Sequence, residues 1–527
     1  MSLQQDQSKG FIFYILVTAV ICGALVMVIE VMGSRVIGPF FGVSLFVWTS
    51  LITVTLVALA LGYGFGGYLA DRYSLPKYLY IIVLIAGALT LMVPVLQAPV
   101  LKLCVPLGLR AGAFTSTLIL FGPTLFLLGC VSPYLVKIAA SQLRNLGAVV
   151  GGLYALSTIG STVGTIVTGF VLVALLGVDK IFLVTGTLLI CLSMGYFIIF
   201  RRQWLAVTAI ALPFILYHPF VFTSKTLADG SELSIVEHTE SFYGTLKVVD
   251  SKSSEGKHSR YMMIDSMIQG GMDMNNGLSI YNYNYYMQFI PYMLHPNGKN
   301  CLVIGLGAGL VPSWYEQNGV SCDIVDIDDK VIQLAKKYFG FKSSGKIYTE
   351  DGRYFLTSTS NKYDYLILDV FNGDITPSHL LSREALQLQR DKLTEKGVLA
   401  VNLIGSLIKE NFMTASVVNT MKQVFDQVEI YPAFRVNERK GLGNLIVVAY
   451  QGEKRDFQPV DNSIFTIHPY FESDIRTHIG TQFSFPENTH AIVLTDNYNP
   501  IDFYDFWLRE FIRQSILETI DWDLLVG

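Results

Sequence analysis

The sequence predicts two regions of different fold class: an N-terminal all-α bundle of membrane-spanning helices, and a C-terminal α/β domain preceded by a small β region. Of its 527 residues, 51% are hydrophobic and only 15% are charged, whereas about 25% of the residues in an ordinary soluble domain are charged. Charges are sparse up to Phe222 and have normal frequency from Ser231 onward. Beyond Asn300, strand-like and helix-like segments alternate, which is typical of a parallel sheet covered by helices.

The N-terminal region, residues 1–222, contains seven apolar runs that are long enough to span a bilayer. A spanning helix needs about 20 apolar residues, because the hydrocarbon core is about 30 Å thick. The runs are Phe11–Gly33, Ser44–Ala70, Tyr78–Gln97, Gly112–Val136, Gly147–Leu176, Val178–Phe200 and Gln203–Phe222. The first run is too long for a signal peptide. The fifth is rich in glycine and serine, which predicts a helix inside the bundle or a break in it.

Glu30 is a carboxylate near the end of the first apolar run. A charge at that depth is costly and usually faces a partner or the bundle interior. We interpret Glu30 as a group that locks helices together through an ion pair or hydrogen bond, with a path for protons or amines as the alternative.

A linker at residues 223–230 leads to residues 231–298, which are predicted to form a small β-rich region and a tyrosine-rich helix at Ile280–Leu294. Alternation with a period of two residues indicates the strands: Leu233–Glu237, Gly244–Val249 and Arg260–Ile264.

The most specific motif is the glycine turn Gly305-Leu306-Gly307-Ala308-Gly309, which follows the apolar strand Cys301–Ile304 and opens a helix. Glycine permits positive φ and a close approach of the backbone to a ligand. The next strand ends in Asp326, where ribose hydroxyls would lie, and the third is followed by Asp351, which could accept from an adenine amine. Pro312 stands where the dinucleotide motif would have its third glycine. The pattern therefore favours an adenosine sulfonium ligand over NAD.

The fourth strand, Tyr365–Leu368, ends at Asp369, in the crevice where such sheets bind ligands. An amine that takes an alkyl group from a sulfonium must first lose its proton, and an Asp can hold and deprotonate it. We predict Asp369 and Asp374 as catalytic. The structural alternatives are a helix N-cap for Asp369 and a turn before Pro377 for Asp374.

From Glu237 to about Tyr450 the chain resembles the spermidine synthase family of aminopropyltransferases. The matching stretches are Glu240–Gly244, Met263–Gln269, Tyr283–His295, the glycine turn, Asp326, Asp351 and Asp369. The chain also resembles the membrane-fused members of this family. This resemblance rests on the apolar runs, on Glu30, Arg35, Pro39, Gly42 and Trp48, and on the late stretch Leu494–Asp502. The resemblance implies a Rossmann-like domain of the class I methyltransferase type over residues 299–527, with a C-terminal extension, and a gate helix within residues 231–298.

The resemblance also implies roles for individual residues. Decarboxylated S-adenosylmethionine, or S-adenosylmethionine, would be the co-substrate, an amine the acceptor and methylthioadenosine the product, without a metal. The cofactor-binding residues would be Gln269, Gly305, Gly307, Gly309, Asp326, Asp351 and Gly352. The substrate-binding residues would be Tyr243, Asp265, Tyr283, His379 and Asp496.

Three positions depart from the family pattern. Ala308 replaces an Asp that pairs with the donor's ammonium, Tyr285 replaces a Glu of the gate helix, and Gly244 replaces a Gln. Without two carboxylates, a cationic tail would be desolvated unpaired, which argues against ordinary putrescine aminopropylation.

Three functions are weighed on these residues. The first is a membrane-anchored aminopropyltransferase, and the second is an enzyme acting on S-adenosylmethionine by methyl or aminocarboxypropyl transfer or by cyclisation. The third is a non-catalytic transporter or sensor for polyamine or nucleotide. The expected partners are a small amine and the lipid bilayer, with a homodimer as a possible assembly. Nucleic acid is excluded, since a net charge of −4 provides no basic excess for phosphates.

The expected location is the cell (inner) membrane, multi-pass, with the catalytic domain in the cytoplasm, where the nucleotide is made. Seven spans would then leave the larger group of basic residues outside, against the positive-inside trend: Lys9, Arg72, Lys77, Lys137, Arg144, Arg201 and Arg202. The smaller group would face inward: Arg35, Lys102, Arg110 and Lys180.

Overall fold

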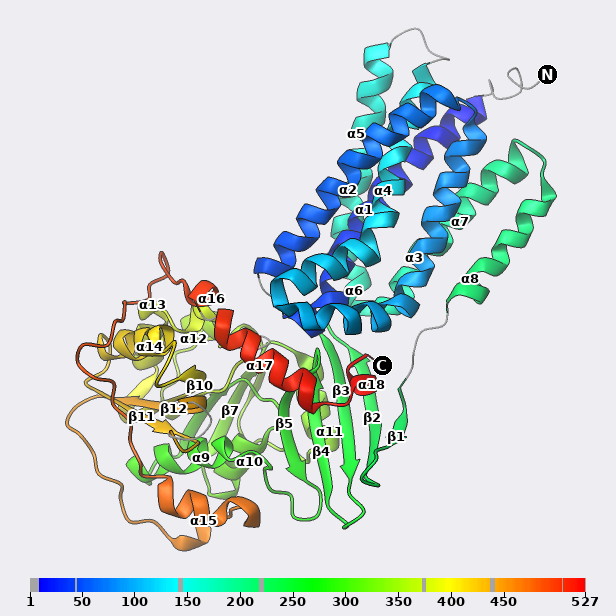
Figure 1. Cartoon of the computed structure of the whole chain (residues 1–527). Helices are drawn as coiled ribbons and strands as arrows, with labels where there is room; N and C mark the ends of the chain where they lie inside the picture. The colour runs from blue at the N-terminus through cyan, green and yellow to red at the C-terminus, as the bar shows by residue number, and fades with distance from the viewer. Residues whose placement is uncertain are drawn as a thin grey trace. The chain divides into compact units, whose positions relative to one another are not determined.

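The computed structural model divides the chain into two compact units (Figure 1). It describes residues 9–42, 45–140, 146–217, 222–371, 376–436, 441–504 and 506–526. Unit 1 comprises Met1–Phe222 together with Asp521–Gly527, and unit 2 comprises Thr223–Ile520. The sequence assigned the last seven residues to the C-terminal domain, whereas the structure packs them with the helical unit.

Unit 1 is a bundle of long apolar helices. They are α1 (Lys9–Phe41), α2 (Leu45–Arg72), α3 (Pro76–Cys104), α4 (Gly108–Ala140), α5 (Leu146–Val167) and α7 (Val178–Ile199). Five helical stretches of the described chain are long and apolar enough to cross a membrane, and one of these, Pro76–Ala140, joins α3 and α4 through the 3-10 turn η1 (Val105–Leu107). The composition of these helices agrees with a membrane-spanning bundle.

The seventh predicted span, Gln203–Phe222, is not a long α-helix in the described residues. It consists of a 3-10 helix, η3 (Trp204–Ala211), and the five-residue helix α8 (Leu212–Leu216), which has a proline in its first turn. Its end still returns along α7, since Tyr217 lies within electrostatic reach of Asp179 at the start of that helix. Hydropathy predicted the apolar run correctly but could not distinguish a 3-10 segment from an α-helix.

The fifth predicted span lies at the outside of the bundle, so its predicted place inside is wrong. Only 17% of its apolar window is buried. The alternative prediction, a break, corresponds to a change of helix type without interruption, because α5 continues as a π-helix, η2 (Thr168–Leu172), before the short helix α6 (Val173–Leu175). Two of its glycines, Gly160 and Gly164, and Ser161 contact α1.

The contact between α1 and α5 depends on the absence of side chains. A Cβ on Gly160 would lie 2.2 Å from the Val20 carbonyl oxygen, and a Cβ on Gly164 would lie 2.5 Å from that of Ala24. Ser161 Oγ donates to the Gly23 carbonyl at 3.0 Å. Small residues thus let the two backbones approach, as in other membrane helix pairs.

Glu30 of α1 contacts a second helix. Its carboxyl group forms a hydrogen bond with Thr55 of α2, which agrees with the interpretation of Glu30 as a helix-locking group.

The C-terminal helix α18 (Trp522–Val526) belongs to this bundle. Its Trp522 ring lies 5.4 Å from the Phe40 ring at the end of α1, and Lys102 near the end of α3 lies 6.0 Å above the same ring. Leu524 and Leu525 are buried. The chain therefore returns to the bundle at the end where α1 and α3 finish.

Unit 2 contains two sheets. The first is antiparallel, in the order β1-β2-β3-β4-β5, with β1 (Ser224–Thr226), β2 (Glu232–Glu240), β3 (Thr245–Lys252), β4 (His258–Ile264) and β5 (Met267–Asp273). It confirms the predicted β region.

The second sheet has seven strands in the order β11-β12-β10-β9-β6-β7-β8. These are β6 (Asn300–Ile304), β7 (Ser321–Asp326), β8 (Ile347–Thr349), β9 (Tyr363–Leu368), β10 (Leu393–Ser406), β11 (Gln427–Pro432) and β12 (Leu442–Tyr450). Strands β6 to β10 are parallel, and β12 runs antiparallel to β10 and β11. This is the predicted Rossmann-like fold.

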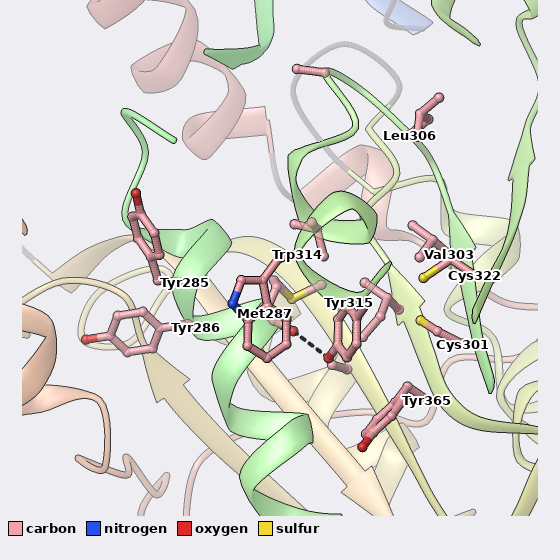
Figure 2. Close-up of a cluster of buried hydrophobic side chains, with 14 of the residues drawn as sticks. Tyr285, Tyr286, Met287, Cys301, Val303, Leu306, Trp314, Tyr315, Cys322 and Tyr365 are labelled. Carbon is pink, nitrogen blue, oxygen red and sulfur yellow. Dashed lines mark hydrogen bonds between the residues drawn. The ribbon is translucent and has the colours of Figure 1, made fainter. Parts of the chain in front are cut away.

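Helices cover both faces of the second sheet. One core packs against α9 (Tyr283–Leu294), α10 (Leu310–Gln317) and α11 (Asp329–Tyr338), and the other against α12 (Gly352–Ser358), α13 (Arg383–Asp391) and α14 (Phe412–Lys422). In the first core, Tyr315 of α10 donates to the Met287 carbonyl of α9 at 3.1 Å (Figure 2). The remaining helices of the unit are α15 (Pro469–His478), α16 (Ile501–Tyr504) and α17 (Phe506–Thr519).

The α1–α5 contact leads to a prediction about stability. Gly160→Ala should destabilise the protein by about 1–3 kcal/mol, because the new methyl group meets a backbone carbonyl that cannot move aside. Gly151→Ala on the same helix is the matched control, since a Cβ there meets nothing within 4 Å and alanine favours helix over glycine. Thermal unfolding in detergent measures both. Equal effects of the two substitutions would show that α5 does not pack on α1 in this way.

Candidate functional site

The candidate site lies at the carboxyl ends of β6, β7, β8 and β9, where the sequence placed its glycine turn and its acids. Parallel strands bring their carboxyl ends to the same edge of a sheet. The turn after β6 has positive φ at Gly305, Gly307 and Gly309, at 87°, 51° and 75°. Residues with a side chain rarely adopt this backbone conformation, which explains why all three positions are glycine.

The glycine turn is held between two other segments. A Cβ on Gly305 would lie 2.2 Å from the Asp369 carbonyl oxygen, and one on Gly307 would lie 2.7 Å from the Gln269 carbonyl oxygen. The structure therefore brings Gln269 and Asp369 together with the predicted turn. Ala308 is buried, and a Cβ on Gly270 of β5 would lie 2.7 Å from the Ala308 methyl group.

Asp326 ends β7 and is tied to the glycine turn by its own carboxylate. Its Oδ2 accepts from the Leu306 N–H at 2.8 Å and its Oδ1 from the Asp328 N–H at 2.9 Å. Burial raises the pKa of Asp326 to about 6, against the effect of these backbone hydrogen bonds. Each oxygen retains a second lone pair, so the carboxylate can still accept from a ligand diol.

Asp351 serves as the N-cap of α12. Its Oδ1 accepts from the N–H groups of Arg353 and Tyr354 at 2.9 and 3.0 Å, and its Oδ2 lies 3.2 Å from His379 Nε2. Gly352 follows it, and a Cβ there would lie 2.6 Å from the Ile304 side chain. The predicted ligand residues Asp351 and His379 are thus paired with each other at the edge of the site.

Tyr243 joins the acidic side of the site from the first sheet. Burial raises the pKa of Tyr243, and the nearby carboxylates of Asp328, Asp351 and Asp326 raise it further. Asp265, by contrast, lies in the β4–β5 turn, where its Oδ1 accepts from the Thr245 N–H at 2.9 Å.

Asp369 follows β9 and faces the start of α9. Burial raises the pKa of Asp369 to about 6, and a hydrogen bond from Asn402 opposes this rise. Burial also raises the pKa of Tyr283, and the Asp369 charge and then Tyr281 raise it further. Asp369 and Tyr283, both predicted from the sequence, therefore lie within electrostatic reach of each other.

Tyr285, set at the position of a gate-helix Glu, is buried in the core: its hydroxyl donates to the Ser279 carbonyl at 2.7 Å and accepts from the His468 N–H at 3.1 Å. Figure 2 shows it among the hydrophobic side chains of this core. Asp374 lies outside the described residues, so its predicted role stays a prediction.

Asp496 pairs with Arg353 of α12. The Arg353 guanidinium contacts both carboxylate oxygens of Asp496 and holds the pKa of that carboxyl at about 2. Asn499 donates to the Ser378 carbonyl at 2.7 Å nearby. These contacts hold the late stretch beside Asp351 and His379. The substrate-binding role predicted for Asp496 stays a prediction.

Sequence reasoning missed Asn402, Tyr261 and Tyr281. Asn402 is fully buried and donates to Asp369 Oδ1 at 2.8 Å. Tyr281 lies within electrostatic reach of Tyr261, and its ring centroid is 6.3 Å from that of Tyr283. A single polar residue within the apolar strand Val398–Leu403 was a usable signal for Asn402. In the part of the chain that the structure describes, no group of three or more His, Cys, Asp or Glu residues could hold a metal ion.

Comparisons with known proteins match this unit. Residues 281–450 match the spermine/spermidine synthase domain. The polyamine aminopropyltransferase of Vibrio vulnificus is 38% identical over 119 residues, which cover 21% of this chain and 39% of that protein. The N-terminal histidine N-methyltransferase of Emericella nidulans is 32% identical over 139 residues, which cover 25% of each chain.

Among solved structures, a probable spermidine synthase from Corynebacterium glutamicum matches with a TM-score of 0.38 and 17% identity, over 49% of this chain and 97% of that chain. The chain covers less than two fifths of the length of the Vibrio relative.

Proposed function

We propose that this chain, in which residues 281–450 match the spermine/spermidine synthase domain, is a membrane-anchored transferase of the aminopropyltransferase type. It moves an aminopropyl group from decarboxylated S-adenosylmethionine to an amine and releases methylthioadenosine. The observation that carries this proposal is Asp369: a buried carboxylate with a pKa of about 6 whose backbone contacts the glycine turn and whose side chain faces Tyr283.

The reaction follows from the position of this carboxylate. The acceptor arrives as an ammonium ion, and Asp369 takes its proton. The freed lone pair attacks the aminopropyl carbon next to the sulfonium. A carbon–nitrogen bond forms, the carbon–sulfur bond breaks, and its electron pair returns to sulfur as methylthioadenosine leaves. A base with a pKa of about 6 is ionised at neutral pH, as general-base catalysis requires.

Asp326 supports the nucleoside part of the proposal. Its carboxylate lies next to the glycine turn, where a ribose diol can bind both oxygens, and Tyr243 and Asp351 lie close to it. This arrangement suits an adenosine ligand, and the polyamine aminopropyltransferase of Vibrio vulnificus is a relative in this part of the chain.

A second function is favoured by Ala308. The resemblance places a carboxylate here that would attract the ammonium tail of the decarboxylated donor, and this chain has a buried methyl group instead. Opposite charges about 4 Å apart are worth roughly 4 kcal/mol at an effective dielectric constant of 20. Without this attraction, the intact donor S-adenosylmethionine competes better, and a relative of this region is a histidine N-methyltransferase.

Product analysis separates the two functions. The full-length protein, purified in detergent, is incubated with each donor and with a mixture of mono- and diamines, and the products are identified by mass spectrometry. Methylthioadenosine together with an aminopropylated amine supports the first function. S-adenosylhomocysteine or an aminocarboxypropyl product supports the second. If neither donor is consumed, both enzymatic proposals are wrong and a non-catalytic binding role gains.

Nucleotide binding should depend on Asp326. We expect Asp326→Ala to lose measurable affinity for methylthioadenosine, because two hydrogen bonds to a charged group, about 1.5–3 kcal/mol each, are removed. Isothermal titration calorimetry measures the affinity. Asp329→Ala is the matched control, since this carboxylate binds Gln333 on the surface of α11. Unchanged affinity in Asp326→Ala would refute the nucleoside site.

Transfer should depend on pH through Asp369. Its raised pKa means that the carboxylate is the base only above about pH 6, so kcat should fall about tenfold per pH unit below this value. Asp369→Asn should lower kcat by a factor of at least about 100 and remove this acid limb, while methylthioadenosine affinity persists. A rate that stays constant down to pH 5 would contradict the role of Asp369 as the base.

The membrane location and its orientation also belong to the proposal. We place unit 2 in the cytoplasm, where the donor is made, with the helical unit in the cell (inner) membrane. The distribution of basic residues favours the opposite orientation, so an accessibility measurement must decide.

Lys252→Cys, on an exposed end of β3, should react with an impermeant maleimide only after the cells are permeabilised. Lys77→Cys, at the α2–α3 turn, should react in intact cells if the chain crosses seven times. Labelling of Lys252→Cys in intact cells would place unit 2 outside, and the wild-type protein controls for its native cysteines.

A further inference from the structure

Asn402 lies beside Asp369 on the neighbouring strand. Val401 of β10 pairs with Leu368, the last residue of β9, so Asn402 within β10 lies level with Asp369, which follows β9. Asn402 is completely buried, and its Nδ2 donates to Asp369 Oδ1 at 2.8 Å. A buried side-chain donor is thus committed to one oxygen of the proposed base.

Asn444 fixes the direction in which the Asn402 amide points. Its Nδ2 donates to Asn402 Oδ1 at 3.1 Å. Asn402 pairs with Ile446 on β12, and Asn444 lies two residues away, so both amides are on the same face of the sheet. If the Asn402 amide turned over, two NH₂ groups would face each other and two oxygens would face each other. Both hydrogen bonds would be lost in a buried site, where unpaired polar groups are costly.

The orientation of the Asn402 amide matters because the surroundings of Asp369 disfavour the charged form of its carboxyl group. Burial raises the pKa of Asp369, and the hydrogen bond from Asn402 opposes the rise. The titratable group that faces it from α9 is Tyr283, and Tyr281 lies next to Tyr283. Burial raises the pKa of both tyrosines, so they stay neutral at physiological pH. Among the described residues, the Asn402 amide is therefore the group that favours the ionised carboxylate.

We propose that Asn402, oriented by Asn444, is a positioning residue that holds Oδ1 of Asp369 and keeps this carboxylate ionised, so that Oδ2 receives the proton of the acceptor amine. This inference rests on the function proposed above for Asp369. An amide suits the task because it favours the ionised form without adding a charge. An Arg or Lys at this position would lower the pKa of Asp369 by about one to three units and weaken the base.

Carbodiimide labelling tests the proposal without turnover. The reagent modifies protonated carboxyl groups, so the pH midpoint of labelling in the peptide that contains Asp369 reports the pKa of this group. Mass spectrometry of the full-length protein in detergent gives the midpoint. In Asn402→Leu it should rise by about one to two pH units, since one hydrogen bond to a charged group is lost. Asn444→Leu should produce a smaller rise, because the amide remains but loses its orientation.

Thr376→Val is the matched control. The Thr376 hydroxyl donates to the backbone carbonyl of Asn402 at 3.2 Å, not to its amide, and is equally buried in this region. This variant should leave the midpoint unchanged. An unchanged midpoint in Asn402→Leu, or an equal shift in Thr376→Val, would overturn the proposal.

Asn402→Asp provides a second route if Asn402→Leu does not fold. It preserves the shape of the side chain and sets two carboxyl groups against each other, so they share a proton and the midpoint at Asp369 should rise. An unchanged midpoint in this variant would also overturn the proposal. If the wild-type protein transfers no alkyl group but the midpoints shift as expected, the positioning role holds and the proposed function alone fails. If transfer occurs, the acid limb of kcat should move with the labelling midpoint while methylthioadenosine affinity stays constant.

Discussion

The backbone of the glycine turn touches two other backbones, and the arrangement of the site depends on these contacts. Gly305 leaves no room for a side chain beside the Asp369 carbonyl, and Gly307 leaves none beside the Gln269 carbonyl. The turn thus fixes how far β5 of the first sheet lies from β6 and β9 of the second. Because the Leu306 N–H also binds the Asp326 carboxylate, one short loop sets the positions of the residues proposed to hold the nucleoside and of the proposed base.

The two buried carboxylates of the site are held in different ways. Asp326 accepts from two backbone N–H groups, which cannot turn away, whereas Asp369 accepts from the side-chain amide of Asn402. Burial raises the pKa of each to about 6. A carboxylate fixed by the backbone suits the recognition of a ligand. A carboxylate with one oxygen held by a side chain suits a group that gains and loses a proton during a reaction.

Local patterns predicted the fold classes and the strand ends, because the glycine turn and the acids Asp326, Asp351 and Asp369 each follow directly from the end of a strand. The contacts that could not be predicted depend on the register between strands that are far apart in the sequence. Asn402 and Asn444 meet only because β12 pairs with β10. Tyr285 turned out to be a core residue, because the phase of α9 directs it toward Ser279 and His468. In the helical unit, apolar length predicted the first six spans but not the irregular seventh segment, and small residues could not indicate on which side of the bundle α5 packs.

The return of α18 to the helical bundle changes what kind of insertion unit 2 is. Trp522 packs near Phe40 and Lys102, and the chain leaves the bundle after Phe222 and re-enters it at Asp521. Unit 2 is therefore inserted between two segments of the helical unit, and the chain connects the two units at both ends of unit 2. A proteolytic cut in one connection would leave the two units joined through the other.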